Sequence, residues 1–179
     1  MSGKRKERTE EEEQVEQCAS FDEIVKSKRI DPDGVEVYDR GDAMGRGVRT
    51  KRAFKRRQIV CSYGGKCYRL NSKEDIKSDS DYKYLIVKNI VVDGAPNLKE
   101  SRGHTGAFIN DANGPIRSPE IKNNVRFSNG SIRNANGVRK RAVWVRAERD
   151  LAAGEELWLA YGKDYWQSRE MIAKQMNKT

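Results

Sequence analysis

The chain has 179 residues, which is enough for one globular domain with a single hydrophobic core. Apolar residues make up 36% of the chain and charged residues 35%, so part of the chain is expected to be disordered. No apolar run in the sequence is long enough to span a membrane. The formal net charge of +9 favours an acidic partner, such as nucleic acid or an anionic surface.

The cysteine and histidine content argues against a structural metal site. Cys18, Cys61 and Cys67 form no C-x-x-C pair, and His104 is the only histidine, whereas a zinc cluster needs about four closely spaced ligands. Since no signal peptide is present either, the sequence predicts a soluble intracellular protein whose cysteines are reduced.

The chain begins with a charged segment and a short helix. Residues 1–19 are predicted to be a disordered tail, in which a basic cluster resembling a nuclear-import signal precedes a run of glutamates. A capping-box pattern starts at Ser20, so residues 20–34 are expected to form a helix to Lys28 and a linker. The β-rich domain is predicted over residues 35–163, and residues 164–179 are predicted to form a closing segment and a helix.

Within residues 35–163 the sequence favours short strands separated by turns. A hairpin is expected over residues 84–92, and a second one is expected to turn at Asn129-Gly130. Other strands are expected to begin at Val35 and to cover residues 58–63, 107–109, 143–147 and 157–160, with one helical turn over residues 72–77. This pattern indicates a mainly β fold with only short helices.

Four segments carry candidate chemistry. One is Asn123-Asn124-Val125, which is polar and then β, and the other three each also have a purely structural interpretation. The glycines of Gly45-Arg46-Gly47 would let the backbone approach a ligand closely, although most such triplets are turns. Asn110 and Asp111 end an apolar run, where they would either bind a ligand or form a turn. Tyr161 precedes a glycine after the apolar run 157–160, which would either place a phenol at the floor of a pocket or pack it in the core.

In this order and at these intervals, the motifs resemble the SET-domain family of protein (histone) lysine methyltransferases. The resemblance covers residues 35–166. The family's elements are matched by Gly45-Arg46-Gly47-Val48, Cys61-Ser62-Tyr63-Gly64-Gly65, an apolar hairpin over 84–93, Phe108-Ile109-Asn110, Asn124, Gly154-Glu155-Glu156-Leu157 and Tyr161-Gly162. The chain departs from the family pattern at His-Ser-Cys, which is Asp111-Ala112-Asn113 here, in an insertion before Asn124, and in lacking flanking cysteine clusters.

The resemblance implies a fold, a reaction and a cofactor. The fold would be several small curved sheets with a threaded, pseudoknot-like C-terminal segment and short helices at both ends. The reaction would be methyl transfer from S-adenosylmethionine to a lysine, with no metal. An aromatic channel would strip water from the lysine ammonium and so lower its pKa from about 10.4.

The resemblance also implies roles for particular residues. The catalytic residues would be Tyr161 and Tyr63, the latter being otherwise a core residue. The substrate channel would contain Phe127, Leu159 and Tyr165, and since neither Phe127 nor Leu159 has a hydroxyl, di- or trimethylation is expected. Arg46 would cover the cofactor or remain solvated, and Asp111 would either replace the family histidine or weaken binding. The cofactor would contact Gly45, Arg46, Gly47, Tyr84, Asn110, Asp111 and Trp166.

The expected substrate is a histone-tail lysine, and the expected location is therefore the nucleus. Nucleosomal DNA would attract a basic patch near the second hairpin, which is otherwise a solvated loop; its residues are Arg133, Arg139, Lys140 and Arg141. Two other functions remain open: an inactive SET-like chromatin-binding module, and a basic β-domain that binds nucleic acid.

Overall fold

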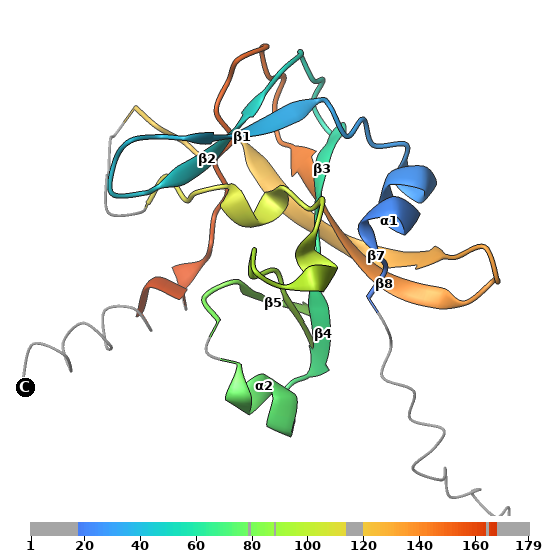
Figure 1. The fold of residues 1–179 in the computed structure, drawn as a ribbon. Coiled ribbons are helices and arrows are strands. Elements are labelled where there is room, and N and C mark those ends of the chain that lie inside the picture. Colours follow the sequence, from blue (N-terminus) through green and yellow to red (C-terminus); the bar gives the residue numbers. More distant parts are fainter. Residues whose placement is uncertain (1–17, 79, 88, 114–119, 164, 168–179) are drawn as a thin grey trace, which may run out of the picture. The chain divides into compact units, whose positions relative to one another are not determined.

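The computed structural model describes residues 18–78, 80–87, 89–113, 120–163 and 165–167, and strands predominate in it (Figure 1). The mainly β class predicted from the sequence is confirmed. The chain divides into two compact units. Of the described residues, those within 18–30, 62–107 and 129–143 belong to unit 1, and those within 31–61, 108–128 and 144–167 belong to unit 2.

Unit 1 contains a three-stranded antiparallel sheet of order β4-β6-β5. Its strands are β4 (Lys66–Arg69), β5 (Lys83–Val87) and β6 (Ile90–Asp93), and α2 (Lys73–Lys77) follows β4. The hairpin predicted over residues 84–92 is therefore present, although its turn residue Lys88 lies outside the described residues. Two 3-10 turns, η2 (Lys99–Ser101) and η3 (Gly106–Phe108), come after β6. None of the helices in the described part of the chain is long and apolar enough to cross a membrane.

The predicted helix α1 (Phe21–Lys28) is confirmed together with its capping box. Glu23 Oε2 accepts the backbone N–H of Ser20 at 2.8 Å, which satisfies a donor at the helix start. Cys18 and Ala19, which the sequence analysis assigned to the tail, are held in place, since Ala19 N donates to Arg141 O at 2.7 Å. The expectation that the cysteines are reduced is wrong for two of them, because Cys18 and Cys67 form a disulfide with Cα atoms 5.7 Å apart.

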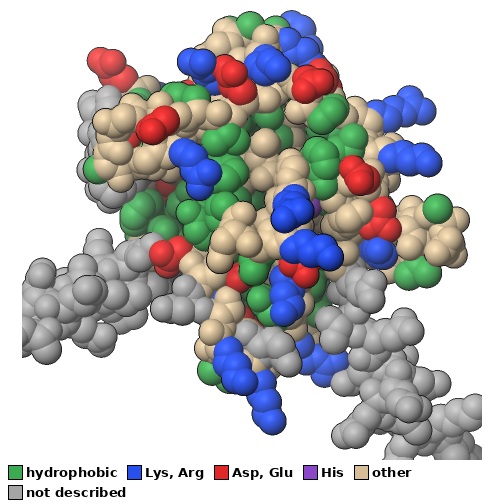
Figure 2. Space-filling view, in the orientation of Figure 1, with side chains coloured by type: hydrophobic (Ala, Val, Ile, Leu, Met, Phe, Trp, Pro, Cys, Tyr) green, Lys and Arg blue, Asp and Glu red, His purple; other side chains and the backbone are tan. Residues whose placement is uncertain are grey.

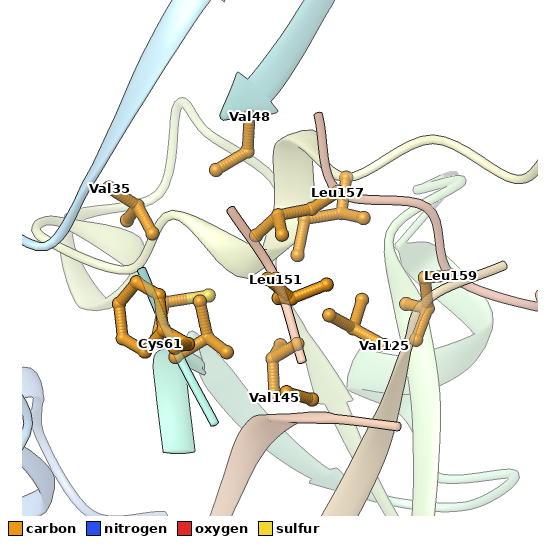
Figure 3. Close-up of a cluster of buried hydrophobic side chains, with 12 residues drawn as sticks. Val35, Val48, Cys61, Val125, Val145, Leu151, Leu157 and Leu159 are labelled. Carbon is orange, nitrogen blue, oxygen red and sulfur yellow. The ribbon is translucent and has the colours of Figure 1, made fainter. Parts of the chain in front are cut away.

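Unit 2 is organised around an apolar cluster (Figure 3). Two antiparallel strands, β1 (Val35–Asp39) and β2 (Arg46–Thr50), place Val37 opposite Val48. Full burial of one such aliphatic side chain contributes about 1.5–3 kcal/mol to stability. The twelve buried residues of this cluster, the unit 2 core, are Val35, Val48, Phe54, Val60, Cys61, Ile109, Val125, Val145, Ala147, Leu151, Leu157 and Leu159.

A third sheet has the order β3-β8-β7 and consists of β3 (Ile59–Tyr63), β7 (Val125–Arg133) and β8 (Arg139–Ala147). Each of these strands contributes residues to both units. The turn predicted at Asn129-Gly130 is wrong, because β7 runs through both residues. The chain turns instead after Asn134, whose Oδ1 accepts Val138 N at 2.9 Å, and Gly137 has the positive φ of 76° that the turn requires.

Two other expected strands are absent. Residues 157–160 form no regular strand; Glu156, Trp158 and Leu159 make single bridges to Arg49, Asn110 and Val125 respectively. This segment thus passes between three separate parts of unit 2, which explains why no ladder with one partner develops. The apolar run at 107–109 begins in the 3-10 turn η3, since short apolar runs do not distinguish helix from strand.

Candidate functional site

Asn110 connects the glycine segment of β2 to the polar segment that follows η3. Its Nδ2 donates to the carbonyl of Arg46 at 2.8 Å, and its own carbonyl accepts Leu159 N at 2.8 Å. The structure therefore brings together two predicted cofactor-binding elements that are 64 residues apart in the chain.

The glycine triplet has a structural reason for both of its glycines. Gly45 has a φ of 70°, which disfavours a side chain, and its Cβ position opens onto empty space. A Cβ on Gly47 would lie 2.7 Å from Glu156 Oε1, so this glycine is required by a contact inside unit 2. Between them, the Arg46 guanidinium is exposed and lies 4.1 Å from the centre of the Phe108 ring.

Tyr161 is held at both its backbone and its hydroxyl. The hydroxyl donates to the carbonyl of Ile109 at 2.7 Å, and the backbone N–H donates to Asp111 Oδ2 at 2.8 Å. The ring is half-buried and packs against the unit 2 core. The phenol is therefore fixed next to Asn110, which directly follows Ile109 in the chain.

Three aromatic rings gather at Tyr161. Tyr165 meets Tyr161 edge-on with ring centres 4.8 Å apart, and it meets Trp166 edge-on at 5.0 Å. The Tyr161 and Trp166 rings are nearly parallel, with an angle of 8° and centres 6.1 Å apart. The predicted catalytic tyrosine, a predicted channel residue and a predicted cofactor residue are thus brought into one cluster.

Asp111 is hydrogen-bonded to two residues of this aromatic cluster and is only 2% exposed. Its Oδ2 also accepts the indole Nε1–H of Trp166 at 2.9 Å. Burial acts to raise the pKa of this carboxyl, but the hydrogen bonds from Asn113, Trp166 and Tyr161 outweigh it and hold the pKa below its ordinary value. Asp111 is therefore a buried, ionised acceptor.

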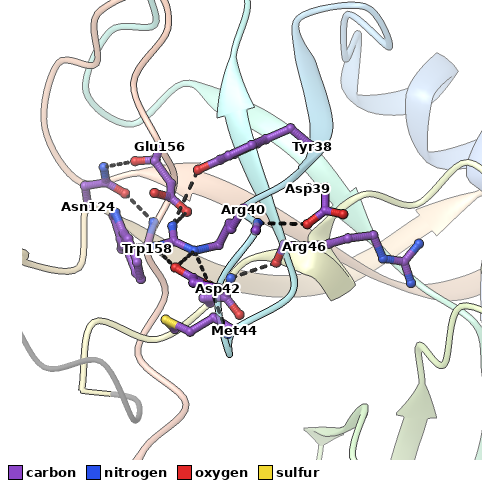
Figure 4. A network of polar contacts seen from close by, with 11 residues as sticks. Tyr38, Asp39, Arg40, Asp42, Met44, Arg46, Asn124, Glu156 and Trp158 are labelled. Atoms are coloured by element: carbon purple, nitrogen blue, oxygen red, sulfur yellow. Dashed lines mark hydrogen bonds and ion pairs between the residues drawn. The ribbon is translucent and has the colours of Figure 1, made fainter.

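Sequence reasoning missed the polar network around Arg40 (Figure 4). The guanidinium pairs with Asp42 at 2.9 Å and with Glu156, and it lies 5.0 Å from the centre of the Trp158 ring. Burial acts to lower the pKa of Arg40, yet the hydrogen bonds to Asp42 and Glu156 raise it above its ordinary value. The ion pair between Arg40 and Glu156 holds the β1–β2 turn against the segment that carries Glu156. No local sequence pattern marks Arg40 as a partner of Glu156.

Asn124 belongs to a segment predicted to carry chemistry and matches the final Asn of the family pattern, and the structure shows its contacts. It is 2% exposed, its Nδ2 donates to the carbonyl of Glu156 at 2.8 Å, and its Oδ1 accepts Trp158 N at 2.8 Å. A buried amide whose donor and acceptor are both used fixes the register of the segment that leads to Tyr161.

The remaining predicted residues lie in different surroundings. Phe127 is half-buried against the unit 2 core, and Leu159 is a core member with 2% exposure. Tyr63 and Tyr84 belong to unit 1, where their ring centres are 6.2 Å apart and the Tyr63 hydroxyl donates to the carbonyl of Tyr82. Burial raises the pKa of Tyr84. Their assignment to the site stays a prediction.

In the described part of the chain, no group of three or more His, Cys, Asp or Glu side chains is placed to hold a metal ion. A comparison with curated proteins found no match. A comparison with protein families matched the SET domain over residues 45–162. Because this match covers more than half of the 179 residues, the chain belongs to the SET domain family, as the motifs in its sequence predict.

Proposed function

We propose that this protein is an S-adenosylmethionine-dependent protein lysine N-methyltransferase that acts on a histone-tail lysine. SET domains are modules of the protein lysine methyltransferase type, which supports the reaction class. The observation that carries the proposal is the convergence of Arg46, Asn110 and Tyr161 within unit 2, through hydrogen bonds of 2.8 Å and 2.7 Å to neighbouring carbonyls. We also propose that the protein is located in the nucleus, and this rests only on the proposed histone substrate. Microscopy of a tagged protein tests the location.

The residues of unit 2 fit a cofactor of this kind. The space beside Gly45 admits a ligand, and the exposed Arg46 guanidinium matches a carboxylate. We propose that aromatic rings of the cluster of Tyr161, Tyr165 and Trp166 contact the cationic sulfonium and the adenine base. When bound, the cofactor supplies a methyl group activated by the positive sulfur.

The chain's own residues would prepare the lysine. Removal of water in an apolar channel disfavours the ammonium form and lowers the lysine pKa, and Tyr165, Phe127 and Leu159 are the channel residues we propose for this. Tyr161 would orient the neutral amine, since its hydroxyl is held by the Ile109 carbonyl at 2.7 Å. We retain di- or trimethylation as the product, because Phe127 and Leu159 bear no hydroxyl that would hold a water in the space of a second methyl.

Calorimetry with S-adenosylmethionine, followed by incubation with histones and nucleosomes, tests the proposal. We expect micromolar binding and mass-mapped di- or trimethyl lysine. A protein that binds no cofactor contradicts the proposal, and monomethyl lysine as the final product contradicts only the degree of methylation. Cofactor binding also separates this function from its alternative, an inactive SET-like module that binds chromatin; Asp111 in place of the family histidine is the feature that favours that alternative.

We further propose that nucleosomal DNA contacts the tip of the β7–β8 hairpin. Arg133 donates to the carbonyl of Gly137 at 3.0 Å and Arg139 to Ser131 Oγ at 2.7 Å, so neither hydrogen bond neutralises a guanidinium. Lys140 is a weaker candidate, because it pairs with Glu23 at 2.9 Å. Lys and Arg side chains are numerous on the face shown in Figure 2, in keeping with the net charge of +9.

Changing Arg133 and Arg139 together to Gln is expected to weaken DNA binding and to reduce the slope of log affinity against log salt by roughly 2, since two phosphate contacts are lost. Fluorescence anisotropy with a labelled duplex over a salt series measures this slope. Lys55→Gln is the matched control, because Lys55 is exposed but pairs with Asp150 at 2.8 Å. An unchanged slope in the double variant, or an equal change in the control, contradicts a contact at the hairpin tip.

A further inference from the structure

We propose that Asp111 is a positioning residue that holds Trp166 and Tyr161 in the arrangement needed for cofactor binding and methyl transfer. We call the hydrogen bonds from Trp166 Nε1 and Tyr161 N to Asp111 Oδ2 the Asp111 latch. The role in catalysis rests on the proposed function, whereas the latch itself is a property of the fold.

The latch uses one carboxylate oxygen for two donors from different parts of the C-terminal segment. Tyr161 N lies 2.8 Å and Trp166 Nε1 2.9 Å from Oδ2. The other oxygen is also occupied, since Oδ1 accepts Asn113 N at 2.9 Å and Asn113 Nδ2 at 3.1 Å, with Asn123 Nδ2 at 3.4 Å. Both oxygens of the buried carboxylate therefore face donors.

None of these hydrogen-bond donors is a cation, so the described hydrogen bonds stabilise the carboxylate charge through N–H dipoles. Hydrogen bonds to an ionised acceptor are roughly twice as strong as those between neutral groups, and 2% exposure keeps water from competing with them. The charge of Asp111 therefore strengthens its hold on both Tyr161 and Trp166.

The latch gives a chemical reason for the departure from the SET pattern at this position. A neutral imidazole has one acceptor nitrogen, whereas a carboxylate has two oxygens with about four acceptor positions. The histidine of the family pattern therefore could not accept two converging N–H groups and the donors from Asn113 as well. Asp111 and Trp166 form a donor–acceptor pair in which the carboxylate accepts the indole N–H.

Trp166→Phe and Asp111→Asn separate the two hydrogen bonds of the latch. Trp166→Phe keeps one aromatic ring but removes the indole N–H, and with it the Asp111–indole bond, together with the second ring of the indole. We expect the dissociation constant for S-adenosylhomocysteine and the KM for the methyl donor to rise at least about 10-fold, with kcat little changed. Asp111→Asn weakens both bonds, so we expect the same rise and a lower kcat, because the Tyr161 backbone is released as well.

The double variant is the decisive measurement. If the carboxylate and the indole act as a pair, the double variant binds cofactor no more weakly than Asp111→Asn, within a factor of about two. If the loss of cofactor affinity in the double variant equals the product of the losses in the two single variants, the proposal is overturned. Trp144→Phe is the matched control, since Trp144 lies in β8 and takes no part in the latch, and it is expected to leave cofactor affinity unchanged.

Tryptophan fluorescence keeps the latch separable from the proposed function. The difference between the emission spectra of the unmodified protein and Trp166→Phe gives the emission of Trp166. In Asp111→Asn we expect this Trp166 emission to shift towards the spectrum of a hydrated indole. A shifted Trp166 component in a protein that binds no cofactor supports the latch and contradicts the proposed function. An unshifted component overturns the latch whatever the cofactor data show.

Discussion

Replacing Tyr161 with Phe is expected to lower methyl transfer at least about 100-fold while the protein stays folded, an effect of the size seen when one preorganised hydrogen-bonding group is removed from a catalytic site. The hydroxyl is the only group lost, and it is held by the Ile109 carbonyl at 2.7 Å. The ring would keep its edge-on contact with Tyr165 and its parallel arrangement with Trp166. The loss should therefore appear in the chemical step and not in cofactor affinity.

Single-turnover transfer with labelled cofactor measures the chemical step, and calorimetry measures binding separately. Denaturant unfolding should show a loss of about 1 kcal/mol, the net contribution of one neutral hydrogen bond. Tyr82→Phe is the matched control, because Tyr82 is an exposed tyrosine in unit 1 that has no proposed role. Transfer at the original rate by Tyr161→Phe would show that another group orients the amine.

The parts of the fold that depend on local chemistry could be predicted from the sequence. The capping box at Ser20 acts over three residues, and the structure contains it as expected. Motif order also predicted that Arg46, Asn110 and Tyr161 belong together, although they are far apart in the chain. That inference came from resemblance to a family, because no local pattern brings distant segments to one place.

The turn between β7 and β8 was mispredicted because two Asn-Gly pairs in the sequence could each form it. The Asn-Gly pair favours a turn at 129–130, but the same pair occurs at 136–137, and the turn forms there because Asn134 Oδ1 accepts both Asn136 N and Val138 N. A strand that continues to residue 133 then leaves Gly130 inside the ladder. Local propensity does not decide between two such turns; pairing with β8 does.

Side-chain pairings between distant segments could not be predicted at all. Arg40 and Glu156 are 116 residues apart, and both look like ordinary surface charges in the sequence. The acceptor role of Asp111 was equally hidden, since it depends on a donor from Trp166. In both cases the role of the residue becomes clear only when its partner is known.

His104 provides the largest expected dependence of stability on pH. Its imidazole is 3% exposed, with Nδ1 2.8 Å from Ser62 Oγ, and Nε2 has no hydrogen-bond partner among the described residues. Its edge meets the Phe21 ring, and a Cβ on Gly64 would lie 2.4 Å from it, so the ring is closely packed within unit 1. Burial disfavours the charged form and lowers the pKa of His104 from 6.5 to about 4.

The sign of the pH effect follows from this lowered pKa. Between pH 6.5 and about 4 the unfolded chain binds a proton at His104 that the folded chain does not. The contribution of the neutral imidazole to the free energy of unfolding is therefore complete above pH 6.5. It is lost as the pH falls to about 4, by about 3 kcal/mol in total. Because His104 is the only histidine, one imidazole resonance in an NMR titration reports its pKa directly. Denaturant unfolding at several pH values should show a steeper loss in the unmodified protein than in His104→Gln, which cannot titrate. Carboxylates titrate at low pH in both proteins, so only the difference between the two slopes of unfolding free energy against pH belongs to His104. Parallel slopes, or an imidazole pKa near 6.5, would mean that the folded protein accommodates a protonated His104 ring.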